Sequence, residues 1–362
     1  MMDGISNLFD YLIWRGDLSF EKDEFNEIDG MILSRFSYAP LEYVFDSEKE
    51  ISIENACKKL LSLDNIKDIV LDNDDPRLFE LFMKSKRFSN LTIFNYINHI
   101  DEKEETQFSA LTIRLTKKVI GIVYRGTDNT LIGWKENLNM GFISPIACQS
   151  YGLNYLLNLS ENFPKDDFIL AGHSKGGNVA SFAGIFAPKN IQDRIIGIFN
   201  YDGPGFVDKV LNETGYKNIS EKIFTYVPQA SLVGMLLGHK EEHQIVHSSE
   251  VVGPFQHNIY SWDVIGKKFI AVDEMTQGSK YFDETFKNWL SNMNTKQREE
   301  FVEASYSLVA DVDAKTLEEM KKNWWSSLKS VSSAMKNMDD VTKQTVSDGI
   351  KLFMKSVKET LK

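Results

Sequence analysis

The residues of this chain that could do chemistry centre on a serine between two glycines. Residues 168–180 read FILAGHSKGGNVA, so an apolar run is followed by the pattern G-x-S-x-G around Ser174 and then by a helical stretch. This order is typical of a nucleophile elbow, in which a strand ends, the chain reverses at the serine and a helix begins. Gly172 and Gly176 suit a turn too tight for a Cβ atom. We predict that Ser174 is a nucleophile and that the backbone N–H of Lys175 donates to an oxyanion.

A serine hydroxyl needs a neighbouring base at neutral pH, and in this arrangement the base is a histidine that follows the serine in the chain. Four histidines follow Ser174, namely His239, His243, His247 and His257. We favour His257, because it lies in a predicted loop after the last predicted strand and can bend over the carboxyl end of a sheet. His247 lies inside a predicted strand, which fixes its direction. We expect His239 and His243, in a charged stretch, to be solvated.

The spacing of His239, His243 and His247 also fits a metal site on a helix. The β-type run over 244–248 argues against that helix. We therefore predict no metal site, and nothing in the sequence calls for a cofactor.

The acid that would orient the histidine is indicated less directly. Its usual position follows the predicted strand 222–227, but the next loop, 228–233, contains no carboxylate. Asp202 ends the preceding predicted strand, so its carboxylate can reach the histidine from one strand away. The alternatives are Asp263, Glu241, or no carboxylate at all, with Gln229 or Ser231 holding the imidazole.

A second oxyanion donor is expected in the loop after an earlier strand. Residues 124–129 read YRGTDN and follow a predicted strand over 119–123. We therefore predict that the N–H and hydroxyl of Thr127 act as this donor. The alternative role of Thr127 is a helix cap or a turn.

Composition limits the class of protein. The 362 residues carry a net charge of −11, so nucleic acid is not an expected partner. The two cysteines, Cys57 and Cys148, do not make a disulfide framework. No apolar run reaches the length of about 18 residues that a membrane-spanning helix needs, and the first residues lack the pattern of a signal peptide. We expect a cytoplasmic protein.

Strands alternate with helical stretches between residues 66 and 270, which we expect to form the core. The predicted strands are 91–97, the hairpin pair 108–115 and 119–124, then 195–201, 222–227 and 244–249, with a helix over 148–161. This alternation predicts an α/β fold with a mostly parallel central sheet flanked by helices. Residues 1–65 read as a helical N-terminal segment that packs on the core, with Ser52 capping a helix over 53–63. Residues 271–362 read as a helical C-terminal extension, with helices over 282–290, 297–310, 316–335 and 341–361.

Several motifs together resemble known families. R-G-T at 125–127 with Trp134, followed by G-H-S-x-G at 172–176, is similar to the class 3 (fungal-type) lipases. The chain more closely resembles a lipase-like bacterial family called domain of unknown function 2974. The matching motifs include Y-L-I-W-R-G-D-L at 11–18, G-H-S-K-G-G-N, Y-D-G-P-G at 201–205 and Q-H at 256–257.

This resemblance covers most of residues 7–310 and implies an α/β-hydrolase fold. From the lipase pattern, Ser174 carries over as nucleophile, Thr127 as oxyanion residue and His257 as base. The lipase acid does not carry over, because its expected place near 229–231 has no carboxylate.

The predicted function is that of a serine hydrolase, an esterase or lipase-like enzyme that cleaves a carboxylic ester through an acyl-enzyme on Ser174. Apolar residues of 131–146 and 232–237 suit the acyl chain of an ester or a lipid, as a lid or a pocket wall, and their alternative role is that of core helices. The alternative function is a non-catalytic protein of this fold that binds a lipid or a protein partner. The missing acid after 222–227 favours that alternative.

The C-terminal stretch combines basic and apolar residues. Residues 315–362 carry ten lysines and six acidic residues, a local charge of +4, together with Trp324, Trp325, Phe353 and Met354. Such a stretch either packs as a helical hairpin on the core or lies on an anionic membrane surface. The second arrangement would make the protein peripheral at the membrane and an interaction module led by its tail.

If the tail binds a membrane surface, the full-length chain floats with anionic liposomes in a density gradient and a 1–310 truncation does not. The reason is that the truncation removes the lysines attracted to anionic headgroups. Equal flotation of the two proteins would contradict the membrane role.

Overall fold

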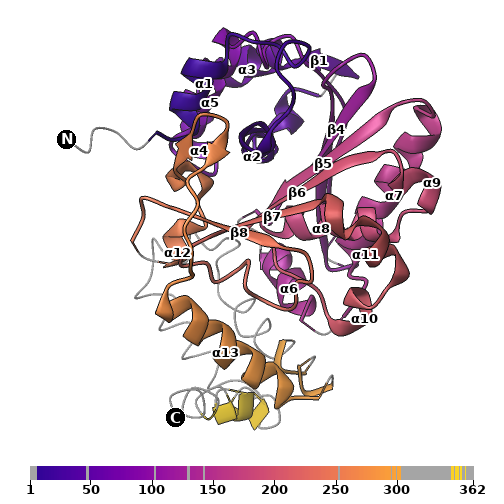
Figure 1. Cartoon of the computed structure of the whole chain (residues 1–362), viewed down its shortest axis with the longest axis vertical. Coiled ribbons are helices and arrows are strands. Elements are labelled where there is room, and N and C mark those ends of the chain that lie inside the picture. The colour runs from indigo at the N-terminus through magenta and orange to yellow at the C-terminus, as the bar shows by residue number, and fades with distance from the viewer. Residues whose placement is uncertain are drawn as a thin grey trace. The chain divides into compact units, whose positions relative to one another are not determined.

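A computed structural model gives the fold of the chain (Figure 1). The structure describes residues 6–45, 49–101, 103–128, 131–141, 143–251 and 253–294, and then 296–298, 300–302, 344–345, 347–349, 351–352 and 355. The chain forms two compact units. The first consists of residues 1–99, 108–126 and 148–279, and the second of 100–107, 127–147 and 280–362. None of the helices in the described ranges is both long and apolar enough to cross a membrane.

One sheet, of eight strands within the described residues, lies in the first unit except for the end of β2 and the start of β3. Its order follows the chain: β1 (Glu50–Ser52), β2 (Thr92–Asp101), β3 (Thr106–Arg114), β4 (Val119–Tyr124), β5 (Asp167–His173), β6 (Ile195–Tyr201), β7 (Ile223–Pro228) and β8 (His243–Val246). The pairs β1–β2 and β3–β4 are antiparallel, and β4 to β8 run parallel. The predicted mostly parallel sheet and its hairpin are confirmed.

Helices cover both faces of the parallel strands (Figure 1). The side chain of Ile198 in β6 lies against α8 (Lys175–Phe186), whereas Tyr201 of the same strand lies against α2 (Glu27–Phe36). Residues three apart on a strand point to opposite faces, so the two helices form separate layers. Parallel crossovers are right-handed as a rule. Because β4 to β8 are added in one direction, their crossover helices share one face and leave the other to the N-terminal helices.

The remaining elements of the described residues are helices, 3-10 helices and one short hairpin. They are α1 (Leu8–Arg15), α3 (Ile53–Leu61), α4 (Ile66–Ile69), α5 (Asp75–Lys84), α6 (Leu131–Asn139), α7 (Ala147–Asn162), α9 (Lys189–Gln192), α10 (Asp208–Leu211), α11 (Thr214–Ile219), α12 (Gly253–Gln256), α13 (Gln277–Ser291), the 3-10 helices η1 (Leu41–Tyr43), η2 (Ser220–Lys222) and η3 (Ile259–Ser261), and the hairpin of β9 (Val264–Ile265) and β10 (Lys268–Phe269). Ser52 caps α3 as predicted, since its Oγ accepts from the N–H of Asn55 at 3.2 Å.

The expected start of the strand region at residue 66 was wrong. Residues 66–69 and 75–84 are helical, and the first strand after them is β2. In α5, Leu78, Phe79 and Phe82 recur at helical spacing and are buried, and a proline stands in the first turn, where a helix tolerates it. The helical N-terminal segment also contains the short strand β1. Of the predicted C-terminal helices, 282–290 lies within α13, whereas 316–335 and most of 297–310 and 341–361 lie outside the described residues.

The second unit holds α6 and most of α13. Glu136 of α6 accepts hydrogen bonds from Thr106 Oγ1 at 3.1 Å and from the N–H of Gln107 at 3.2 Å. The indole N–H of Trp289 in α13 donates to the carbonyl of Gly349 at 3.0 Å. These contacts connect α6 to the start of β3, and α13 to a segment sixty residues further along the chain.

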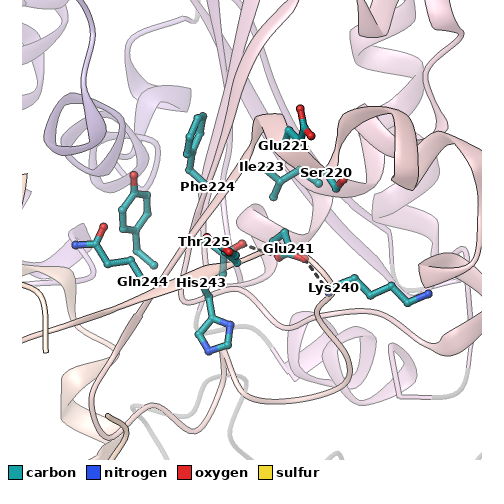
Figure 2. A pocket seen from close by; sticks show the side chains of 11 residues that line it. Ser220, Glu221, Ile223, Phe224, Thr225, Lys240, Glu241, His243 and Gln244 are labelled. Carbon is teal, nitrogen blue, oxygen red and sulfur yellow. Dashed lines mark hydrogen bonds between the residues drawn. The ribbon is translucent and has the colours of Figure 1, made fainter. Parts of the chain in front are cut away.

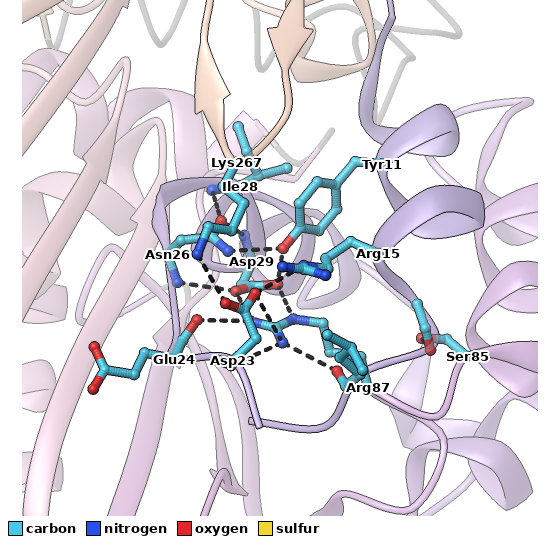
Figure 3. A network of polar contacts seen from close by, with 12 residues as sticks. Tyr11, Arg15, Asp23, Glu24, Asn26, Ile28, Asp29, Ser85, Arg87 and Lys267 are labelled. Carbon is cyan, nitrogen blue, oxygen red and sulfur yellow. Dashed lines mark hydrogen bonds and ion pairs between the residues drawn. The ribbon is translucent and has the colours of Figure 1, made fainter. Parts of the chain in front are cut away.

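A buried ion pair anchors the N-terminal helices of the first unit (Figure 3). The side chains of Arg87 and Asp29 have no exposed surface, and they form two contacts, of 2.6 and 2.7 Å. Arg87 also donates to three backbone carbonyls within 18–24, and the hydroxyl of Tyr11 donates to Asp29 at 2.8 Å. A buried charge destabilises the fold unless hydrogen bonds satisfy it. The guanidinium therefore holds the loop 18–24 and α2 together.

We expect Asp29→Asn to lower the free energy of unfolding by about 3–5 kcal/mol, because it leaves the buried guanidinium of Arg87 without its counter-ion. Urea denaturation at neutral pH measures the difference. Glu54→Gln is the control, since it removes the partner of an exposed lysine, Lys58, and should cost at most about 1 kcal/mol. Equal losses in the two variants would contradict this account.

Candidate active site

Ser174 lies at the sharp turn between β5 and α8. Its backbone has φ 58° and ψ −134°, a conformation that costs a residue with a side chain about 1–3 kcal/mol. A Cβ on Gly172 would lie 2.2 Å from the carbonyl of Gly176, and a Cβ on Gly176 would lie 2.1 Å from the carbonyl oxygen of Tyr124. The predicted strand–serine–helix turn is confirmed, and both glycines are there because the backbone leaves no room for a side chain.

Asp202 lies at the same edge of the sheet, directly after β6. Its side chain is fully buried, and its N–H donates to the carbonyl of Tyr226 in β7 at 2.8 Å. Oδ1 accepts from the hydroxyl of Ser231 and from the N–H of Gly234 at 3.0 Å, and Oδ2 lies 2.6 Å from Nδ1 of His257. A carboxylate only accepts, so Nδ1 of His257 carries a proton in this contact. The other ring nitrogen, Nε2, is then the one that can take a proton from a hydroxyl.

His257 lies beside the elbow. Its ring centroid is 4.4 Å from that of His173, the residue before Ser174, and the carbonyl of His257 accepts a hydrogen bond from Nε2 of His173 at 2.8 Å. The side chain of His257 is 26% exposed, whereas Asp202 behind it is buried. The protein therefore contacts one side of the imidazole ring and leaves the other side accessible to solvent.

His173 supports the position of His257 and is itself a neutral imidazole. Because its Nε2 donates to a carbonyl, its Nδ1 accepts, and the donor is the hydroxyl of Tyr38 at 3.0 Å. Burial holds the pKa of His173 well below its usual value of 6.5. Tyr38 follows α2, so the N-terminal helical segment reaches the candidate site.

The other carboxylates considered as the acid contact different histidines. Asp263 pairs with Nδ1 of His247, and Glu241 lies 2.8 Å from Nδ1 of His239. Asp202 is thus the carboxylate that touches His257 among the three. The contact between Asp202 and His257 agrees with the expectation that a carboxylate at this strand end can reach the histidine.

Two expectations about this region were wrong. The side chain of His239 is only 9% exposed rather than solvated, because both of its ring nitrogens contact protein acceptors. β8 ends at Val246, so His247 lies just beyond the strand and not inside it. Of the alternatives left open, Gln229 does not hold an imidazole, since its amide donates to a backbone carbonyl at 3.1 Å.

The candidate oxyanion donors follow the elbow and β4. Lys175 begins α8, so its N–H stands in the first turn of a helix directly after Ser174. A Cβ on Gly126 would lie 3.1 Å from the Cβ of Ser174, so the loop after β4 reaches the elbow. Thr127 is next in the chain and belongs to the second unit, where its hydroxyl donates to the side chain of Asn137 at 2.9 Å. The oxyanion roles of Lys175 and Thr127 stay predictions.

Sequence reasoning missed Asn178, which holds the turn after Asp202. Its amide donates to the carbonyls of Pro204 and Gly205 at 3.0 and 2.9 Å, and its oxygen accepts from Gln149 at 2.7 Å. The signal was present, because Asn178 ends the motif G-H-S-K-G-G-N. No comparable signal marks Tyr38 or His239.

The mostly parallel eight-stranded sheet with a serine at a strand–helix elbow defines a protein of the α/β-hydrolase type. A family model described as Mbeg1-like matches residues 82–307, more than half of the chain. The chain therefore belongs to the Mbeg1-like family. The resemblance to domain of unknown function 2974 is not part of this match and stays a prediction.

Solved lipase structures are distantly similar to the chain. A Rhizomucor miehei lipase–propeptide complex is 16% identical, over 44% of this chain and 57% of its own, with a TM-score of 0.34. A fungal lipase–inhibitor complex is 14% identical over 60% and 77%, with a TM-score of 0.40. A mutant form of MDLA from Penicillium cyclopium is 12% identical over 69% and 86%, with a TM-score of 0.39. The chain spans little more than half of the Rhizomucor lipase. Comparison with curated proteins gives no match.

We expect the protein to lose stability as the pH falls below about 6.5, because the unfolded chain protonates His173 and the folded chain does not. The unfolded state then binds more protons, so the free energy of unfolding rises with pH in this window, by up to about 1.4 kcal/mol per unit from this residue. Urea denaturation at about pH 5 and pH 7 measures the effect. In His173→Gln the difference between the two pH values should shrink by up to about 2 kcal/mol, and an unchanged difference would contradict the neutral assignment.

Proposed function

We propose that the protein is a serine hydrolase that cleaves a carboxylic ester through an acyl-enzyme on Ser174. The main support for this proposal is a contact beside the elbow, in which Nδ1 of His257 lies 2.6 Å from Oδ2 of Asp202. It selects the tautomer in which Nε2 accepts a proton, and it stabilises the imidazolium that forms when the serine is deprotonated. The exposed side of the ring allows a substrate to approach.

In this mechanism the Oγ of Ser174 attacks the ester carbonyl while Nε2 of His257 takes the hydroxyl proton. The negative charge of the tetrahedral intermediate falls on the former carbonyl oxygen, which accepts from the N–H of Lys175. The C–O bond to the alcohol breaks and the alcohol leaves with the proton from His257. Water then hydrolyses the acyl-enzyme by the same steps, with His257 again as base.

The substrate class we propose is an ester with an apolar acyl chain, such as a lipid. The loop 232–237, one of the two segments expected to contact an acyl chain, is irregular and not a core helix. Its apolar side chains are partly exposed, and they are Leu232, Val233, Met235, Leu236 and Leu237. The backbone of this loop contacts Asp202, so these side chains lie near the proposed chemistry. The other segment, 131–146, belongs to the second unit.

The alternative, a non-catalytic protein of the same fold that binds a lipid or a protein partner, is less well supported. It rested on the missing carboxylate after β7. Asp202 brings a carboxylate to His257 from the end of β6, so that observation no longer favours it. Contact of the tail with a membrane remains a proposal, because Trp324, Trp325 and most of 315–362 lie outside the described residues. A cytoplasmic location is likewise a proposal.

We expect a fluorophosphonate probe to label the wild-type protein at Ser174, and Ser174→Ala to abolish both labelling and hydrolysis of p-nitrophenyl acyl esters. Asp202→Asn should keep Ser174 in place and lower kcat by about 10³–10⁴-fold, because it upsets the tautomer of His257. Ser181→Ala is the matched control, since this buried serine lies in α8, the helix that follows Ser174, and its hydroxyl has no hydrogen-bond partner among the described residues. A wild-type protein that the probe leaves unlabelled, or labels elsewhere, would overturn the proposed function.

A further inference from the structure

One of the other imidazole–carboxylate pairs is connected to Asp202 through Gly234. Its carboxylate is Glu241, which lines a hollow of about 540 Å³ at the start of β7 and β8 (Figure 2). Glu241 accepts from Thr225 Oγ1 at 2.7 Å, from the hydroxyl of Tyr216 and from the N–H of Lys240 at 3.2 Å. Burial alone would raise the pKa of Glu241, but its hydrogen bonds and its attraction to the neighbouring imidazole lower it to about 2. The group is therefore an ionised carboxylate.

The imidazole of the pair is His239, and its partners define its protonation. Nδ1 lies 2.8 Å from the carboxylate of Glu241, and Nε2 lies 2.9 Å from the carbonyl oxygen of Gly234. An ionised carboxylate and a carbonyl only accept, so both ring nitrogens must donate, and only the imidazolium has two N–H groups. The other titratable groups near this pair are Tyr216, whose hydroxyl contacts Glu241, and His243, whose ring centroid lies 6.3 Å from that of His239. The ammonium of Lys240 donates instead to the carbonyl of Leu211 and to the side chain of Asn212.

Gly234 connects this pair to the candidate site. Its carbonyl accepts from His239, while its N–H donates to Oδ1 of Asp202 and to the hydroxyl of Ser231, both at 3.0 Å. Ser231 in turn donates to the same carboxylate oxygen. The position of Gly234 therefore sets the direction of Oδ1 of Asp202, and with it the direction of Oδ2, which faces His257.

We propose that His239 is a positioning residue for the candidate site: as an imidazolium tied to Glu241, it fixes Gly234 and thereby orients the carboxylate of Asp202 toward His257. The kinetic consequence rests on the proposed function. The geometric part of the proposal does not rest on that function, because the contacts that lead from Glu241 to His257 are present whether or not the protein hydrolyses a substrate.

Nitrogen-15 NMR of the full-length protein with labelled histidine tests the geometry. The chain has six histidines, so single substitutions assign the spectrum. At neutral pH, His239 should show two protonated ring nitrogens, whereas His173 should show one. In His239→Leu the Nδ1–H resonance of His257 should shift, because Asp202 loses its fixed orientation. His243→Leu is the matched control, since this exposed neighbour has a ring near His239 and should leave the resonance of His257 in place.

Glu241→Gln provides a second variant that keeps the shape of the side chain. It removes the charge that His239 balances, so His239 should become neutral and keep its single N–H for Gly234. The resonance of His257 should then stay closer to the wild-type position than in His239→Leu. An unprotonated ring nitrogen on His239 of the wild-type protein, or an unmoved His257 resonance in folded His239→Leu, would overturn the proposal.

Ester hydrolysis measures the consequence. We expect His239→Leu to lower kcat about tenfold with KM within about twofold, because a misplaced acid impairs the chemical step more than binding. His239→Gln retains a donor for the carbonyl of Gly234 and should recover part of the rate. If the probe fails to label wild-type Ser174, the proposed function fails, and the NMR measurements still decide the role of His239.

Discussion

The buried carboxylate of Asp202 is the constraint on which the arrangement of the site depends. An ionised group without exposed surface destabilises the fold by several kcal/mol unless donors replace water. The donors come from two separate loops: Ser231 and Gly234 from the loop after β7, and His257 from the loop after α12. Satisfying one charge therefore brings both loops to the same edge of the sheet. The imidazole is placed by this requirement and not by its distance along the chain.

The strained backbone of Ser174 has support from several directions. Its N–H donates to the carbonyl of Tyr201 at 2.9 Å, so the end of β6 holds the turn from which Asp202 also departs. His173, one residue earlier, contacts both His257 and Tyr38. Strain at a functional position persists only where the surroundings determine it fully. The N-terminal segment, which brings Tyr38, is for this reason part of the site's framework.

Local patterns predicted the local features, namely the elbow at Ser174, the hairpin of β3 and β4 and the cap at Ser52. Our interpretation failed over 66–84, where we expected strands although buried apolar residues recur at the spacing of a helix. The pairing of histidines with carboxylates lies beyond such patterns. The three pairs found here are separated by 2, 16 and 55 residues along the chain, and the pair beside Ser174 is the most distant. Proximity in sequence would have chosen Glu241 or Asp263. The place of Asp202 at the end of a predicted strand pointed to it instead, and the packing of loops over the sheet edge brings it to His257.

Asp202 lies one strand earlier than the usual place of such a carboxylate, and the sheet itself explains why it can still reach His257. β6 and β7 are parallel neighbours with Tyr201 opposite Tyr226, and Asp202 donates its N–H to the carbonyl of Tyr226. Adjacent strands lie about 4.8 Å apart, a gap that a side chain can span. A carboxylate at the end of either strand can thus face the same imidazole. In this chain β6 brings the carboxylate, and the loop after β7, which lacks one, brings the donors that hold it. The carboxylate and the donors that hold it thus come from two loops, and in our proposal the orientation of Asp202 depends on a residue as far along the chain from Ser174 as His239.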